Sequence, residues 1–273
     1  VFDEAGQSTE ANTIVPICHG IDQVALIGDT KQLPATVKSE YARTHGMEFS
    51  LFERLIEKGL DHTLLAVQYR MNPTIGGFPY MYFYDGGVTH GKTAEKFGVP
   101  KFPWKDEHIP VMIIDVAGAE ETDGVDENGK EKTSFMNESE CFVIRDVVDR
   151  FLEGGTAASQ IGIITTYKEQ VKLLWEKYDM KSRNVSCDTV DRFQGDERDV
   201  IIFSAVRCNP KNIAGHVADV RRLNVALTRA RRGLVVVCSM QTLGRSSQVW
   251  SSYFEWATKR SLVIEDVEFY ATL

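Results

Sequence analysis

Five short runs of apolar residues constrain the fold of this chain more than any other feature. They are rich in valine and isoleucine, and they lie at residues 24–27, 111–114, 161–164, 200–203 and 234–237. Unbroken apolar runs of this length are typical of parallel strands that helices cover on both faces. Helical patterns lie between them, at residues 50–58, 137–153, 168–178 and 221–231. The alternation predicts an α/β fold with a parallel sheet flanked by helices.

The length and composition are those of an ordinary folded protein of two domains. The chain has 273 residues, of which 43% are hydrophobic and 26% are charged, which excludes disordered, collagenous and coiled-coil classes. Five cysteines lie far apart without a C-x-x-C pair, so the sequence indicates neither a zinc site nor a disulfide framework. No apolar run approaches the roughly 18 residues of a membrane helix, and no signal peptide is apparent. We therefore expect a cytoplasmic or nuclear protein that makes no membrane contact.

The net charge of −8 is concentrated in one segment. Residues 118–140 contain eight acidic residues and two lysines, together with glycines and few apolar residues. This composition predicts a solvated acidic loop at about residues 118–136. Because the rest of the chain is close to neutral, the acidic overall charge does not exclude a local basic groove for nucleic acid.

Two short patterns near the N-terminus suit phosphate chemistry. The sequence VFDE at residues 1–4 has the form of a buried strand that ends in two carboxylates. Nucleoside triphosphatases of the P-loop class use such carboxylates to hold Mg²⁺ and to position the attacking water. From Gly28 to Gln32, a glycine permits a tight turn and a neutral amide can hydrogen-bond a phosphate or a water. Taken singly, either pattern could be a plain solvated turn.

Five motifs follow one another along the chain: DEAGQ at residues 3–7, GDTKQLP at 28–34, QYRMNP at 68–73, TVDRFQGDERD at 189–199 and RRLNVALTRARR at 221–232. In order and spacing they resemble motifs II to VI of the superfamily 1 helicases, in the up-frameshift and senataxin-like branch. The resemblance covers nearly the whole chain. It implies a RecA-like P-loop NTPase fold, in which residues 1–65 end a first RecA-like domain and residues 66–273 form a nearly complete second one.

The resemblance implies ATP and Mg²⁺ as cofactors, and it gives roles to residues whose chemistry suits them. Asp3 would hold Mg²⁺, with Glu4 beside it as a further ligand and as the base that orients or deprotonates the attacking water. Gln32 would sense the γ-phosphate. Tyr69 would stack on the adenine ring, and a tyrosine of the hydrophobic core is the alternative.

Arginines in two of the motifs suit the transition state of phosphoryl transfer. Arg70 and Arg229 resemble the two arginine fingers of the family, which reach the γ-phosphate and stabilise its developing charge. On a continuous helix through the last motif, Arg222 and Arg229 would share a face. Gly195 and Glu197 resemble the part of motif V that approaches the ribose of the nucleotide.

Single-stranded RNA or DNA is the partner that the resemblance implies. Thr189 would contact the backbone of the strand, and Thr165 would lie at a strand end that faces the same groove, followed by Thr166 and Tyr167. Hydroxyls and backbone amides suit phosphate contacts that carry no sequence information. The family usually has a proline where Thr166 stands, so a plain loop is the alternative here.

The sequence GGVTHGKT at residues 86–93 fits the G-x-x-x-x-G-K-[ST] pattern of a phosphate-binding loop. A true P-loop follows a buried strand and opens a long helix, whereas a proline and five aromatic residues precede this pattern, and Gly98 and Pro100 soon follow it. In the family the phosphate loop also precedes motif II. We therefore expect a chance match, and we expect the family's own phosphate loop to lie before Val1.

These features together predict the C-terminal part of an ATP-dependent RNA or DNA helicase, which couples ATP hydrolysis to translocation on a single strand and to duplex unwinding. We expect the chain alone to be inactive, because it lacks the phosphate loop of the family. Two alternatives stay open. One is a non-hydrolysing RecA-like module that binds nucleic acid or regulates a partner, and the other is a phosphotransferase that uses Lys92 and Thr93.

Overall fold

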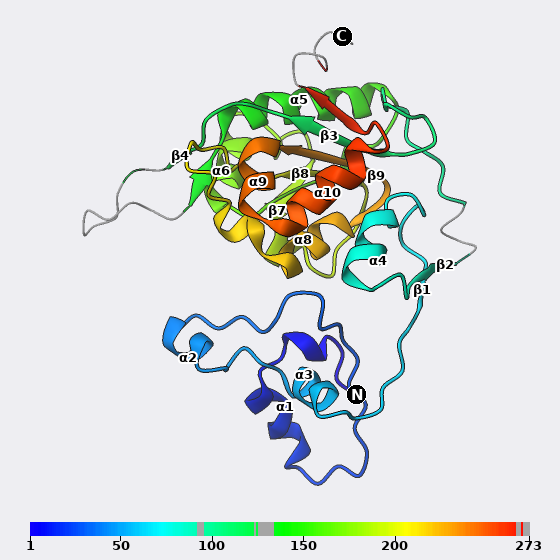
Figure 1. Ribbon diagram of the computed structural model, residues 1–273, viewed down its shortest axis with the longest axis vertical. Helices are drawn as coiled ribbons and strands as arrows, with labels where there is room; N and C mark the ends of the chain where they lie inside the picture. The colour runs from blue at the N-terminus through cyan, green and yellow to red at the C-terminus, as the bar shows by residue number, and fades with distance from the viewer. Residues whose placement is uncertain (92–95, 123, 125–133, 266–268, 270–273) are drawn as a thin grey trace. The chain divides into compact units, whose positions relative to one another are not determined.

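The computed structural model describes residues 1–91, 96–122, 124, 134–265 and 269 (Figure 1). The chain divides into two compact units, Val1–Ala66 and Val67–Leu273. Lys92 and Thr93 of the phosphate-loop pattern, and most of the predicted acidic loop, lie outside the described residues. Within the described part of the chain, no helix is long and apolar enough to span a membrane.

The regular structure of the first unit consists mainly of short helices. They are η1 (Ala5–Gln7), α1 (Glu10–Ile17), α2 (Glu40–Thr44) and α3 (Leu51–Glu57). Ser50 caps α3 by accepting a hydrogen bond from Glu53 N at 3.0 Å, and Gly59 follows the helix with a φ of +81°. The helix predicted at residues 50–58 is therefore confirmed.

The apolar run at residues 24–27 is shorter as a strand than predicted. Its only described strand contact is a single parallel bridge between Phe2 and Leu26. Val24 and Ile27 are exposed, so this run is not covered on both faces in the way that a buried strand requires. The bridge still joins the beginning of the chain to the segment that leads into the second motif.

A six-stranded parallel sheet organises the second unit, in the order β10-β3-β9-β8-β6-β7 (Figure 1). The strands are β3 (Val111–Asp115), β6 (Ile161–Thr165), β7 (Ser186–Thr189), β8 (Arg198–Ser204), β9 (Ala230–Cys238) and β10 (Val263–Glu265). Four of the predicted apolar runs form the centres of β3, β6, β8 and β9. The predicted α/β fold with a parallel sheet is therefore confirmed.

Helices cover both faces of this sheet. On one face, α5 (Glu138–Glu153) and α6 (Lys168–Glu176) bury Val147 and Leu174 in a cluster with Ile202 of β8. On the other face, α10 (Gln248–Thr258) stacks Trp250 on Phe203 of β8, with ring centroids 6.1 Å apart, and α9 (Met240–Ser246) packs beside α10 (Figure 1). Neighbouring residues of β8 thus face opposite helical layers, which is why the strand is apolar throughout its centre.

Shorter elements complete the second unit. The helical ones are α4 (Gly77–Phe83), η3 (Ala158–Gln160), α7 (Val190–Phe193), η4 (Gly215–Ala218) and α8 (Val220–Leu227). Among the strands, β1 (Val67–Gln68) pairs in parallel with β2 (Thr89–His90), and β4 (Glu121–Thr122) pairs antiparallel with β5 (Phe135–Met136).

The helix predicted at residues 221–231 is wrong at its C-terminal end. Helix α8 ends at Leu227, where the hydroxyl of Thr228 donates to the last carbonyl groups of the helix. From Ala230 the chain forms β9, because its aliphatic residues pair with β3 and β8 in the centre of the sheet. Arg222 and Arg229 therefore do not share a helix face.

The carboxyl ends of three neighbouring strands lie side by side. Thr165 of β6 is in register with Thr189 of β7 on one side and with Ser204 of β8 on the other. Loops that leave this edge of a parallel sheet share one rim, where open α/β sheets usually bind their ligands.

Candidate functional site

In the first unit, backbone contacts join two of the motifs. Ala5 N donates to Ile27 O at 2.8 Å. A Cβ at Gly28 would lie 2.8 Å from Gly6 N, so only a glycine allows the two turns to approach so closely. The DEAGQ turn therefore lies directly against the GDTKQLP turn.

Two exposed carboxylates stand at the first of these turns. The N–H of Glu4 donates to Asp3 Oδ1 at 3.0 Å, and its carboxylate accepts from Gln7 Nε2 at 2.6 Å. Glu4 has a φ of +51°, a left-handed conformation that is uncommon outside glycine and that often occurs at functional sites. Across the described ranges, no group of three or more His, Cys, Asp or Glu residues could hold a metal ion. Two carboxylates nonetheless fit Mg²⁺, which proteins commonly bind by one or two carboxylates together with substrate phosphates and water.

The side chain of Gln32 is oriented by the turn in which it lies. Its Nε2 donates to Asp29 Oδ2 at 2.9 Å, while Asp29 Oδ1 accepts from Lys31 N at 2.8 Å. Asp29 therefore fixes both the backbone of the turn and the amide that the resemblance assigns to the γ-phosphate.

In the second unit, the side chain of Gln68 builds the QYRMNP turn. Its Oε1 accepts from Arg70 N at 2.9 Å and from Met71 N at 2.8 Å, and its Nε2 donates to Met71 O at 2.8 Å. Tyr69 is 60% exposed, which excludes the alternative of a core tyrosine. A Cβ at Gly91 would lie 2.3 Å from Tyr69 Cε1, so the ring rests against this glycine and leaves most of its surface for stacking.

The side chain of Arg70 lies among residues of motifs V and VI. Its Nε is paired with the carboxylate of Glu197, and its Nη1 donates to Thr228 O at 3.3 Å. The backbone adds a further contact, since Asn72 N donates to Arg231 O at 2.7 Å. Three motifs that are distant in the sequence therefore meet inside the second unit.

Arg229 packs against the end of α8, close to Arg70. It is only 2% exposed, and its Nε donates to Val225 O at 3.1 Å and its Nη2 to Thr228 Oγ1 at 3.0 Å. Burial raises the pKa of the Tyr80 hydroxyl, and the charges of Arg70 and Arg229 both act to lower it. The guanidinium groups of Arg70 and Arg229 are therefore both near the side chain of Tyr80. To reach a phosphate, Arg229 has to leave its present partners.

The motif V turn carries the two residues that the resemblance assigns to the ribose. Gly195, just after α7, has a φ of +86°, in the region that favours glycine. The carboxylate of Glu197 faces Arg231 as well, at 3.8 Å. Asp199 of β8 pairs in turn with Arg232 at 3.4 Å. The arginines of motif VI thus face the carboxylates of motif V.

The residues expected to contact nucleic acid are neighbours at the sheet edge, but their side chains are buried. Thr165 Oγ1 accepts from Tyr167 N at 3.4 Å, and Thr189 lies at the end of β7 in register with it. The buried hydroxyl of Tyr167 donates to Ala214 O at 3.4 Å, so this ring is not presented to a base.

The GGVTHGKT pattern lies in a context unlike that of a phosphate loop. The element before it is helix α4, which ends at Phe83, and Thr89–His90 within it form strand β2. The described residues of the pattern therefore lack the strand, loop and helix that a phosphate loop requires. This context agrees with the expected chance match.

Sequence reasoning missed the role of Gln68, whose side chain builds the QYRMNP turn. It also placed Glu120 on the solvated surface of the acidic loop, and that prediction is wrong for this residue. The side chain of Glu120 is largely buried and pairs with Arg207 at 2.9 Å. A signal of such a buried pair was available in the sequence, since Arg207 follows an apolar strand by only three positions.

Comparisons with known proteins agree with this arrangement. A family model described as "AAA domain" matches residues 47–241, and a second model with the same description matches residues 1–40. Since the first covers more than half of the chain, the chain belongs to this AAA-domain family, in the superfamily 1 helicase branch of the up-frameshift and Sen1 type.

Curated relatives are similar over almost the whole chain. It is 37% identical over 273 residues to the "Regulator of nonsense transcripts 1 homolog" of Drosophila melanogaster, which covers 97% of this chain and 22% of the relative. It is 36% identical over 274 residues to the "ATP-dependent helicase NAM7" of Saccharomyces cerevisiae, covering 97% of this chain and 28% of that protein. For the "Helicase sen1" of Schizosaccharomyces pombe the identity is 36%, covering 96% of this chain and 16% of that protein. The chain thus spans between 16% and 28% of these three relatives.

Proposed function

We propose that this chain supplies part of the motor of an ATP-dependent RNA or DNA helicase, which acts in the cytoplasm or the nucleus. Residues 1–65 would end a first RecA-like domain, and residues 66–273 would form most of a second one. The observation that carries the proposal is the contact among Arg70, Glu197 and Thr228, which joins motifs IV, V and VI in one unit. Relatives that are named as helicases support it.

ATP and Mg²⁺ are the cofactors of the proposed reaction. Asp3 and Glu4 would hold the ion, which supplies charge neutralisation at the phosphate oxygens when bound. Glu4 would orient the attacking water and take its proton. Gln32 would exchange its bond with Asp29 for one to the γ-phosphate, and the exposed ring of Tyr69 would stack on adenine.

The two arginine fingers would have to change partners during the cycle. Arg70 would leave Glu197 for the γ-phosphate, which frees the Glu197 carboxylate for the ribose hydroxyls. Arg229 would leave the carbonyl of Val225 and the hydroxyl of Thr228. Such a change of partners links nucleotide binding to the shape of the motif V turn, whose neighbouring strand end carries Thr189.

The test is the ATPase kinetics of the natural protein that carries this chain, with the variants Arg70→Lys and Arg229→Lys. Lysine keeps the charge and loses the planar fork. We expect kcat to fall by a factor of about 10³ or more, whereas the Kd for ATP changes by less than about tenfold. Arg54→Lys is the matched control, because Arg54 holds Glu10 with two bonds of 2.8 and 2.6 Å in the first unit.

Parallel losses of kcat and ATP affinity in the Arg70 and Arg229 variants would show that neither is a finger. If single-stranded nucleic acid does not stimulate ATP hydrolysis by the wild-type protein, the proposed function is contradicted. That result would favour the non-hydrolysing RecA-like module.

A further inference from the structure

The residue that follows β8 by two positions has a strained backbone. Val206 has a φ of +69°, which for a residue branched at the β-carbon is a genuine outlier. Its N–H donates to Glu140 Oε2 at 2.9 Å, and its carbonyl accepts from Asn137 Nδ2 at 3.0 Å. Strain of this kind persists only where the surroundings impose it, and it gathers at sites with a function.

The next residue forms a buried ion pair. Arg207 donates to the carboxylate of Glu120 through Nε at 3.0 Å and through Nη2 at 2.9 Å, and the two side chains are only 6% and 11% exposed. The guanidinium also lies 4.0 Å from the centre of the Phe135 ring. Burying two charges is costly unless the geometry is good and the remaining polar atoms are satisfied.

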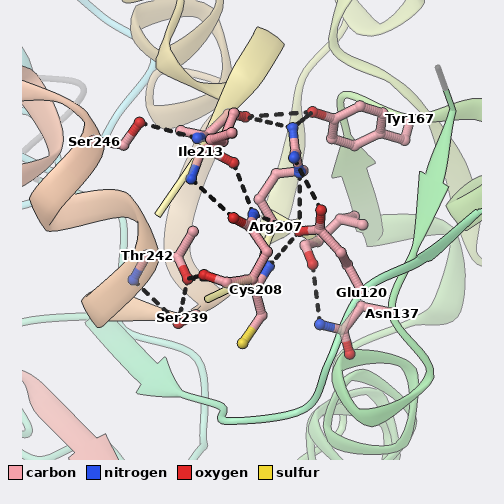
Figure 2. Close-up of polar contacts among 12 residues, drawn as sticks. Glu120, Asn137, Tyr167, Arg207, Cys208, Ile213, Ser239, Thr242 and Ser246 are labelled. Atoms are coloured by element: carbon pink, nitrogen blue, oxygen red, sulfur yellow. Dashed lines mark hydrogen bonds and ion pairs between the residues drawn. The ribbon is translucent and has the colours of Figure 1, made fainter. Parts of the chain in front are cut away.

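This ion pair connects three segments beyond the carboxyl ends of the sheet strands (Figure 2). Glu120 Oε2 accepts from Cys208 N at 2.7 Å and from Asn209 Nδ2 at 3.0 Å. Arg207 Nη1 donates to Tyr167 Oη at 3.3 Å and to Ala214 O at 3.2 Å. The chain after β3, the chain after β6 and the loop at residues 208–214 are thus held together.

The loop is also braced within itself. Asn209 Oδ1 accepts from Ile213 N at 3.0 Å, and its Nδ2 donates to Ile213 O at 2.9 Å. Ser246 Oγ of α9 accepts from Ala214 N at 3.0 Å, as Figure 2 also shows. The outer part of the loop nevertheless meets solvent, since Lys211 is exposed and Ile213 is 49% exposed.

We propose that the Arg207–Glu120 pair positions the loop at residues 208–214 as a preformed contact for single-stranded nucleic acid. Lys211 meets a phosphate of the strand, and Ile213 packs against a base or a ribose. This proposal rests on the proposed helicase function and adds a contact to it. Arg207 does not touch the strand, because it is buried behind the loop and acts through it.

Two features of the site favour a nucleic-acid backbone over other partners. The loop follows β8, whose last residue, Ser204, is in register with Thr165. It therefore lies beyond the same row of strand ends as Thr189, where motif V begins. A rigid loop with one cation and one apolar side chain can bind phosphate and sugar without reading a base. Ordering the loop in advance lowers the entropy cost of binding.

The test measures binding of a fluorescein-labelled oligouridine to the full 273-residue chain by fluorescence anisotropy over a range of salt concentrations. The variants are Arg207→Lys, Glu120→Gln and Lys211→Ala. Arg183→Lys is the control, because it pairs with Asp149 in the same unit away from this loop. Thermal unfolding confirms that each variant is folded. Glu120→Gln keeps the shape of the side chain and carries the test if Arg207→Lys does not fold.

We expect Arg207→Lys and Glu120→Gln to weaken binding by about tenfold, although lysine keeps the positive charge. Lys211→Ala should lower the slope of log K against log salt by about 0.7, the value for one phosphate contact on a single strand. The control should bind like the wild type. Arg207→Lys should also raise the rate of amide hydrogen exchange in the loop, whereas the exchange rates of the amides in β3 and β9 should stay as in the wild type.

If the wild type binds and the loop variants bind equally tightly with the same salt slope, the inference is wrong and the proposed function stands. A wild-type chain that does not bind the strand contradicts this inference, whereas the proposed function is tested separately by the ATPase kinetics of the natural protein.

Discussion

Glu140 is a buried carboxyl that should make the stability of this protein depend on pH. Its Oε2 accepts from Ser204 Oγ at 2.6 Å and from Val206 N at 2.9 Å, whereas its Oε1 has no hydrogen-bond partner among the residues that the structure describes. Burial raises the pKa of this carboxyl from 4.5 to about 8. The group is therefore neutral in the folded protein at pH 7 and ionised in the unfolded chain.

The size and sign of the effect follow from this difference. Between pH 4.5 and about pH 8 the unfolded chain binds fewer protons than the folded protein, so the free energy of unfolding falls as the pH rises. One proton corresponds to about 1.4 kcal/mol per pH unit. Raising the pH from about 5 to about 7 should therefore cost up to about 3 kcal/mol through Glu140 alone.

The assay is urea unfolding at several pH values for the wild type and for Glu140→Gln. Glutamine cannot ionise, so the variant should lose less stability between about pH 5 and about pH 8, and the difference between the two curves should approach the slope of one proton. Glu138→Gln is the control. The hydrogen bond from Lys177 lowers the pKa of Glu138, so that residue titrates below this pH range. Parallel curves for the wild type and Glu140→Gln would refute the reasoning.

Two further predictions concern single side chains. Gly91→Ala should weaken binding of a fluorescent adenine nucleotide by up to about tenfold, because the new Cβ would lie 2.3 Å from the Tyr69 ring. Gly98→Ala is the control, since a Cβ there would make only an ordinary contact with Arg232 Nη2 at 3.8 Å. Equal Kd values for the wild type and Gly91→Ala would show that the ring does not stack. Trp250→Phe should lower the free energy of unfolding by about 2 kcal/mol in urea, since the buried indole also donates to Val217 O at 2.8 Å. A change below about 0.5 kcal/mol, the value expected for the exposed Trp175→Phe, would contradict the packing described for β8.

Much of the sheet could be predicted from the sequence, because its signal is local. Strands buried on both faces must be apolar at almost every position, so β3, β6, β8 and β9 are visible as aliphatic runs. The edge strand β7, with the sequence SCDT, has no such pattern and was missed. The end of α8 was also missed, since Thr228 and Ala230 have side chains that both a helix and a strand accept.

The candidate site likewise has residues that the local sequence indicates and residues that it does not. Exposed motif residues such as Asp3 and Tyr69 could be proposed as site residues from the motifs themselves. The partners that hold the motifs could not, because a buried polar network depends on contacts between residues far apart in the sequence. Glu120 and Arg207 are 87 residues apart, and the composition of the acidic segment favoured a solvated side chain for Glu120.

The most direct test of the central claim, that this chain carries the hydrolytic carboxylate of a single-strand-stimulated motor, is ATP turnover by the natural protein with and without Glu4→Gln. In the presence of single-stranded RNA or DNA, the wild type should hydrolyse ATP, and Glu4→Gln should lower kcat by about 10²- to 10⁴-fold while it still binds Mg·ATP. Turnover by Glu4→Gln at the rate of the wild type would contradict the account.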